Sequence, residues 1–144
     1  MPLFNGFGSL LVGILLVPNL IFALTTRNGF QNKWHNRLVE ALEQVGRFGC
    51  FFCMIVNLPG LCFGCPSEAA FALYLSAGAV LTALYCLCWA VLFRRPGVFR
   101  ALALSVLPAA LFLCSGVLTR SLPLVFFSLL FAPCHIMLSY QNAK

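Results

Sequence analysis

The chain has 144 residues, of which 62% are apolar and only 8% are charged, and its formal net charge is +6. A soluble domain has about 45–50% apolar and about 25% charged residues, so this composition excludes an ordinary water-soluble fold. It predicts an all-α, multi-pass membrane protein, because the apolar stretches are continuous and do not alternate as in a β-barrel. The basic residues flank these stretches, so we expect them to meet lipid headgroups and not nucleic acid.

Stretches without charged residues predict five transmembrane helices in a single membrane domain, residues 1–144. A helix that crosses the bilayer needs about 20 residues. The stretches cover residues 7–24, 48–64, 69–93, 101–118 and 122–140. The basic residues collect between the first two stretches, between the third and fourth, and at the C-terminus. Because Lys and Arg stay on the cytoplasmic side, we expect the N-terminus outside, the C-terminus inside, and the chain in the cell (plasma or inner) membrane.

Residues 35–47, before the second stretch, have the pattern of a short amphipathic helix on the cytoplasmic side. Apolar residues recur at helical spacing from Trp34 onward, and the other face carries Arg37 and the i,i+4 pair of Glu43 and Arg47. This helix either lies on the inner leaflet, with Trp34 and Arg37 at the lipid interface, or continues into the second span.

The second cytoplasmic loop is short and strongly basic. It carries Arg94, Arg95 and Arg100 around a Pro-Gly turn. We expect these arginines to contact anionic lipids at the cytoplasmic face or to dock a protein partner.

Polar side chains beside prolines form the candidate site inside the membrane. Proline removes a backbone donor and frees a carbonyl one turn earlier. Such prolines lie inside four of the predicted spans: Pro18, Pro59, Pro108 and Pro133. Asn19, Asn57 and His135 lie within two residues of three of them. In one interpretation they bond the freed carbonyls and hold helices together, and in the other they line a path for a small polar solute.

Two CxxC pairs, Cys50–Cys53 and Cys62–Cys65, stand out among eight cysteines. In one continuous helix, Cys50 and Cys62 would be about 18 Å apart. That separation is too large for a shared zinc ion, whose bonds to thiolates are about 2.3 Å long. We therefore predict no metal site and no cofactor. Cys62 and Cys65, near the outer face, are the candidates for a thiol–disulfide couple.

The sequence leaves three functions open. The first is a carrier or channel-like protein for a small solute, working as a homodimer because five helices are few to enclose a path. The second is a non-catalytic accessory subunit of a larger membrane complex, and the third is a membrane redox protein using Cys62 and Cys65. No nucleotide-binding or hydrolase motif is present, and no Asp or Glu falls inside a predicted span. These absences disfavour an enzyme and a carboxylate-based antiporter.

Overall fold

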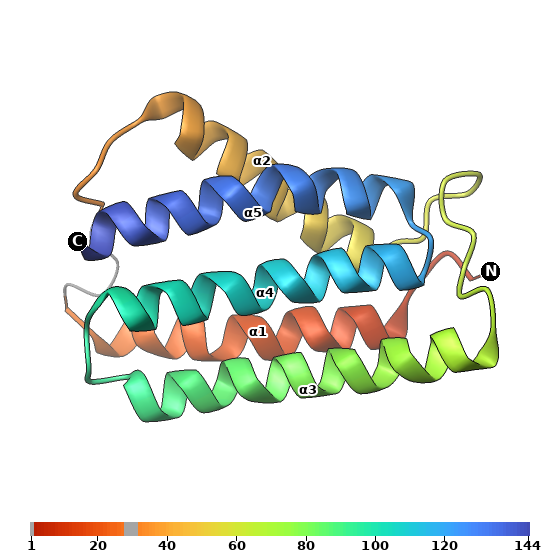
Figure 1. Ribbon diagram of the computed structural model, residues 1–144, viewed down its shortest axis with the longest axis horizontal. Helices are drawn as coiled ribbons and strands as arrows, with labels where there is room; N and C mark the ends of the chain where they lie inside the picture. Colours follow the sequence, from red (N-terminus) through yellow and green to blue (C-terminus); the bar gives the residue numbers. More distant parts are fainter. Residues whose placement is uncertain (1, 28–31) are drawn as a thin grey trace.

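The computed structural model describes residues 2–27 and 32–144, and in these ranges the chain folds into five α-helices. They are α1 (Gly6–Thr25), α2 (Arg37–Ile55), α3 (Glu68–Leu92), α4 (Val98–Leu118) and α5 (Leu122–Ala143). The helices follow the long axis of the molecule, and each runs antiparallel to the next one in the chain (Figure 1). Among the described residues there is no strand beyond two isolated β-bridges. The predicted all-α class is confirmed.

Four of the helices, α1, α3, α4 and α5, are long and apolar enough to cross a membrane. They match four predicted spans: 7–24, 69–93, 101–118 and 122–140. Their outer surfaces are apolar as well, with Leu24 exposed by 77% and Phe126 by 63%. Soluble proteins rarely expose so much continuous apolar surface. The helices therefore indicate a membrane protein.

The amphipathic helix expected at 35–47 continues into the segment expected as the second span, which is one of the two arrangements that the sequence leaves open. The expected span at 48–64 is helical only as far as Ile55. Residues from both segments form one continuous helix, α2, which begins where the Asn36 side chain accepts a hydrogen bond from the Val39 amide. The helix ends at Ile55 because Pro59 disfavours helical geometry just before it and Gly60 adopts a left-handed φ of 80°. α2 thus carries charged residues, and it is not among the four helices apolar enough to span.

α2 nevertheless crosses the bundle obliquely, from the end that holds the C-terminus towards the end that holds the N-terminus (Figure 1). At one end, the carbonyl of Ile55 accepts a 2.7 Å hydrogen bond from the amide of Asn5, at the start of α1. Near the other end, the amides of Lys33 and Trp34 donate to Asn142 Oδ1, in the last turn of α5. Its 19 residues give α2 a length of about 28 Å, close to the thickness of the hydrocarbon core.

The two faces of α2 are inverted relative to a helix of a soluble protein. Its buried face holds Glu43, which is 2% exposed, together with small residues and cysteines. Its outward face holds the apolar residues Leu38, Val45, Phe48 and Phe52, all more than half exposed. A helix with its carboxylate inside and its apolar stripe outside is suited to a lipid environment.

Glycines let α2 and α5 approach closely. A Cβ added at Gly46 would lie 2.8 Å from Phe131 Cα, and one added at Gly49 would overlap the ring of Phe127. Small residues at such crossings are the usual means by which membrane helices come together. The close crossing fixes which side chains of α5 face Glu43.

Prolines interrupt three of the helices. Pro18 lies inside α1, Pro108 inside α4 and Pro133 inside α5, as predicted. Pro59 does not lie in a helix, because it belongs to the connection between α2 and α3.

Candidate functional site

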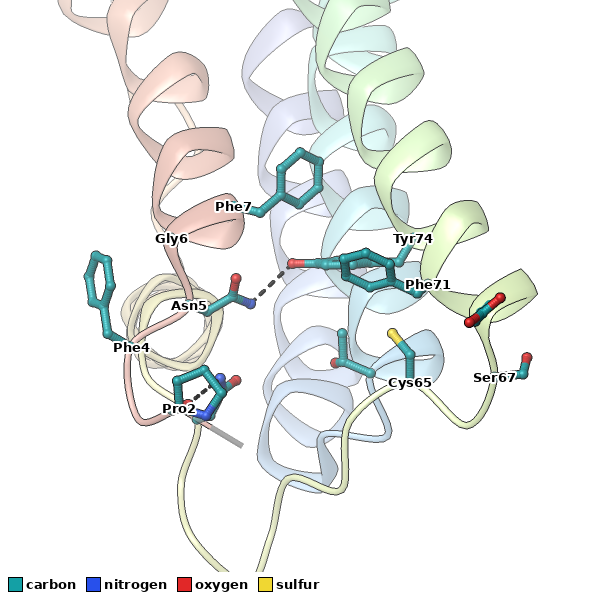
Figure 2. Close-up of a pocket in the computed structure, with 12 residues that line it drawn as sticks. Pro2, Phe4, Asn5, Gly6, Phe7, Cys65, Ser67, Phe71 and Tyr74 are labelled. Atoms are coloured by element: carbon teal, nitrogen blue, oxygen red, sulfur yellow. Dashed lines mark hydrogen bonds between the residues drawn. The ribbon is translucent and has the colours of Figure 1, made fainter.

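A pocket of about 660 Å³ opens at the end of the bundle that holds the N-terminus, and we call it the outer pocket (Figure 2). Its volume falls in the range of about 300–1,000 Å³ that is usual for small-molecule sites. Aromatic rings from α1 and α3 and from the segment before α1 form much of its wall: Phe4, Phe7, Phe71 and Tyr74. Amide, hydroxyl and carboxylate groups also line it: Asn5, Asn57, Ser67, Thr119 and Glu68. None of the described lining residues is basic.

Asn5 links the two walls of the outer pocket. Its Oδ1 accepts a 3.0 Å hydrogen bond from the amide of Gly8 and so caps α1, which needs such an acceptor for its first free N–H groups. Its Nδ2 donates to the Tyr74 hydroxyl at 3.1 Å (Figure 2). The Tyr74 oxygen therefore acts as an acceptor here, and its own hydrogen is available to a ligand. The rings of Phe7 and Tyr74 also pack edge to face, with centroids 5.2 Å apart.

Glu68 gives the outer pocket a negative charge. Ser67 Oγ accepts from the amide of Ala70 and caps α3, and Glu68 follows in the first turn. A carboxylate there is stabilised by the helix dipole. The basic residue in the nearby α4–α5 turn, Arg120, donates instead to the backbone carbonyls of Phe63 and Gly64.

The three polar residues predicted from the sequence lie in separate contacts. Asn19 Nδ2 donates to Leu15 O at 2.8 Å and to the Tyr85 hydroxyl at 2.5 Å, which joins α1 to α3. The carbonyl that it bonds is next to that of Ile14, which Pro18 deprives of its helical partner. Asn57 reaches the outer pocket and donates to Pro2 O at 2.9 Å.

His135, the third of them, faces α2 and meets a carboxylate. Its Nδ1 lies 2.9 Å from Glu43 Oε1, and its ring stacks on that of Phe131 with centroids 4.5 Å apart. Arg47 donates to the same Glu43 oxygen from one helical turn away. Glu43, Arg47 and His135 thus form a charged cluster between α2 and α5, which we call the Glu43 cluster.

The Glu43 cluster was missed by the sequence reasoning, although its signal was visible. The sequence pattern shows the i,i+4 pair of Glu43 and Arg47 but places it on the charged face of an amphipathic cytoplasmic helix. In the structure Glu43 is buried within the bundle, about 18 Å of helix before Ile55. The observation that no carboxylate lies in the predicted spans therefore does not describe the folded bundle. A buried ionisable cluster of this kind is expensive in a membrane and commonly marks function.

The cysteines are all free thiols. Cys62 Sγ lies 3.2 Å from Ser121 Oγ, and Cys65 lines the outer pocket. Burial raises the pKa of the Cys65 thiol, which lowers the fraction of reactive thiolate at neutral pH. The thiol–disulfide couple stays a prediction.

The basic residues predicted to contact lipid or a partner lie at the other end of the bundle. Arg37, Arg94 and Arg95 are exposed, and Trp34 is half-buried beside the end of α5. Arg100 instead donates to Phe93 O at 3.1 Å and lies over the ring of Phe22, so it braces the α3–α4 turn.

Metal ligands do not cluster in the part of the chain that the structure describes. Within residues 2–27 and 32–144, no group of at least three His, Cys, Asp or Glu side chains is placed to hold an ion. The candidate site therefore consists of the outer pocket and the Glu43 cluster. No protein family, no curated protein and no solved structure matches this chain.

Proposed function

We propose that the protein is a five-pass membrane carrier for a small organic cation, which it binds in the outer pocket. The observation that carries this proposal is the pocket's wall, which combines four aromatic rings with the Glu68 carboxylate and no described basic residue. This is unusual in a chain whose net charge is +6. Aromatic faces attract cations, by about 0.5–2 kcal/mol per contact, and a nearby carboxylate adds to that attraction.

The fifth pass is provided by α2. Its outward stripe is apolar and can face lipid, whereas Glu43 is buried and paired with Arg47 and His135. Pairing lowers the cost of holding these charges inside the bundle. Five passes put the two basic loops and the C-terminus on one side, which agrees with retention of Lys and Arg in the cytoplasm. The outer pocket then opens outside the cell membrane.

A route for the solute beyond the pocket follows the contact between α1 and α3. Below the pocket, Leu11 and Phe7 pack against Gly78 and close the route. Further along, Asn19 and Tyr85 form the next polar pair between the same helices. Pro18 weakens the backbone bonding of α1 close to that pair, so a change in the bend of α1 is the movement we expect during transport. The predicted homodimer or larger complex remains part of this proposal.

Binding is tested with the purified full chain and benzyltrimethylammonium, using thermal stabilisation as the measurement. The uncharged analogue 2,2-dimethylpropylbenzene has the same shape and serves as the control ligand. We expect stabilisation by the cation and little by the analogue. Phe71→Leu should weaken binding between about twofold and about thirtyfold, because it removes one aromatic face. Glu68→Gln should weaken binding, whereas Glu40→Gln, outside the pocket, should not.

Transport is tested separately, by uptake of the same cation into proteoliposomes. Uptake that saturates and falls in Phe71→Leu supports a carrier. Equal stabilisation by the cation and its neutral analogue would overturn the cation site. Binding without uptake would overturn the carrier and leave a cation-binding protein.

A further inference from the structure

A second pocket, of about 530 Å³, lies at the opposite end of the α1–α3 pair, and we call it the inner pocket. Pro18 and Ile21 of α1 and Trp89 and Val91 of α3 form apolar walls, and Arg94 and Arg95 stand at the α3–α4 turn. The turn lies at the end of the bundle that holds the C-terminus (Figure 1).

The inner pocket has the charge opposite to that of the outer pocket. Arg94 and Arg95 are both exposed, and neither forms an ion pair with any residue of the described ranges. None of the described lining residues is acidic. Arg100 does not share their role, because it is bonded to Phe93 O and stacked on Phe22. Its contacts hold the turn from which the two free guanidinium groups project.

The walls below the two arginines are open toward the surroundings of the bundle. Ile21 is exposed by 49% and Val91 by 58%. The next turn of α1 adds Leu24, which is exposed by 77%. An apolar groove that ends in two unpaired guanidinium groups matches a molecule with an acyl chain and a phosphate. Arginine binds phosphate oxygens in a bidentate manner, which a lysine cannot do.

We propose that the inner pocket binds one anionic phospholipid, with its phosphate held by Arg94 and Arg95 and an acyl chain lying along Ile21 and Val91. This inference does not depend on the identity of the solute proposed for the outer pocket. Basic pockets between membrane helices on the cytoplasmic side are known to hold such headgroups. A lipid rather than a soluble phosphate is favoured because most of the wall is apolar and would otherwise stay uncovered.

The test uses Trp89 as a reporter inside the pocket. The chain has two tryptophans, so the variant Trp34→Phe leaves Trp89 as the single emitting residue. The full chain is reconstituted in phosphatidylcholine and titrated with phosphatidylglycerol whose acyl chains carry bromine, a contact quencher. The comparison titration uses brominated phosphatidylcholine. We expect brominated phosphatidylglycerol to quench Trp89 at a mole fraction about twenty-five-fold lower than brominated phosphatidylcholine does. Each arginine contributes about fivefold to this difference in affinity.

Two variants of equal charge separate a site from general attraction to the surface. Arg94→Gln with Arg95→Gln should abolish the preference for phosphatidylglycerol, whereas Lys33→Gln with Arg37→Gln should retain it. An unchanged emission maximum of Trp89 shows that the variants fold. The proposal is overturned if the protein with Arg94 and Arg95 intact shows no preference for phosphatidylglycerol, or if both double variants lose that preference equally. Displacement of the lipid by millimolar glycerol phosphate would also overturn it in favour of a soluble phosphoester.

Discussion

Replacing Glu43 by glutamine tests whether the Glu43 cluster holds α2 against α5. Glutamine keeps the size of the side chain but removes the negative charge that Arg47 and His135 share. We expect a clear loss of stability, because at least one cation is then left without its partner inside the bundle.

The size of the effect follows from the burial of the three side chains. Glu43 is 2% exposed, His135 20% and Arg47 35%. Breaking a fully buried pair costs about 3–5 kcal/mol, and a lone charge at the bilayer centre costs about 2.5–3.5 kcal/mol on insertion scales. Because Arg47 is partly exposed, we take the lower part of the range, about 3 kcal/mol. In a chain of this length that corresponds to a fall in Tm of about 6–12 °C.

Buried thiols provide the assay. Cys50 is 0% exposed and Cys53 3%. Cys134 is buried as well. After the five more exposed thiols have been blocked in the folded protein, a fluorogenic maleimide reports the temperature at which these three become accessible. The control is Glu40→Gln on the same helix, since Glu40 pairs with a His35 that is 74% exposed and should contribute less than about 1 kcal/mol. If Glu43→Gln lowers Tm no more than this control, the cluster is not a buried ion pair and the reasoning fails.

Three further measurements address other parts of the structure. Gly46→Ala should cost about 1–3 kcal/mol, because the added Cβ meets the backbone of α5, whereas Gly13→Ala, with nothing within 4 Å, should cause no loss of stability in the same melting assay. Tyr85→Phe should lower stability by about 0.6 kcal/mol, the average for a hydrogen bond between membrane helices, and a loss above about 2 kcal/mol would contradict that role. Because burial raises the pKa of Cys65, its alkylation should reach half its maximal rate at a higher pH than that of free cysteine in the same buffer, and a lower midpoint than that of free cysteine would favour the redox hypothesis.

The length of each stretch without charged residues is enough to locate four helices from the sequence. An apolar run of about 20 residues in a membrane protein can adopt few structures other than a spanning helix. The length is not enough to locate α2. Its charged residues, Glu43 and Arg47, interrupt the apolar run, and their partner His135 is on a helix far away in the chain. A pattern within one helix cannot reveal such a partner, so the sequence indicates only that the pair lies on the charged face of an amphipathic helix.

The outer pocket was also beyond the reach of the sequence. Only Asn57 of its lining had been singled out for a solute path, while Asn5, Tyr74 and Glu68 had not. The pocket depends on a 3.1 Å contact between Asn5 and Tyr74, which are 69 residues apart in the chain. Contacts of that separation depend on how α1 and α3 pack, and the composition of each helix does not determine it.

The two pockets lie at opposite ends of the same helix pair and have opposite charge, which links the two proposals. In the proposed carrier, a cation that leaves on the inner side would pass near Arg94 and Arg95, which line the inner pocket. An anionic lipid bound there would neutralise these residues and lower the electrostatic barrier to release. We therefore expect uptake of benzyltrimethylammonium to be faster in proteoliposomes that contain phosphatidylglycerol than in phosphatidylcholine alone. The variant Arg94→Gln with Arg95→Gln should transport the cation at the same rate in both lipids, because it lacks the two positive charges that the anionic lipid would neutralise. If the unsubstituted chain transports the cation at the same rate in both lipids, the two pockets are not coupled, even if each binds its own ligand.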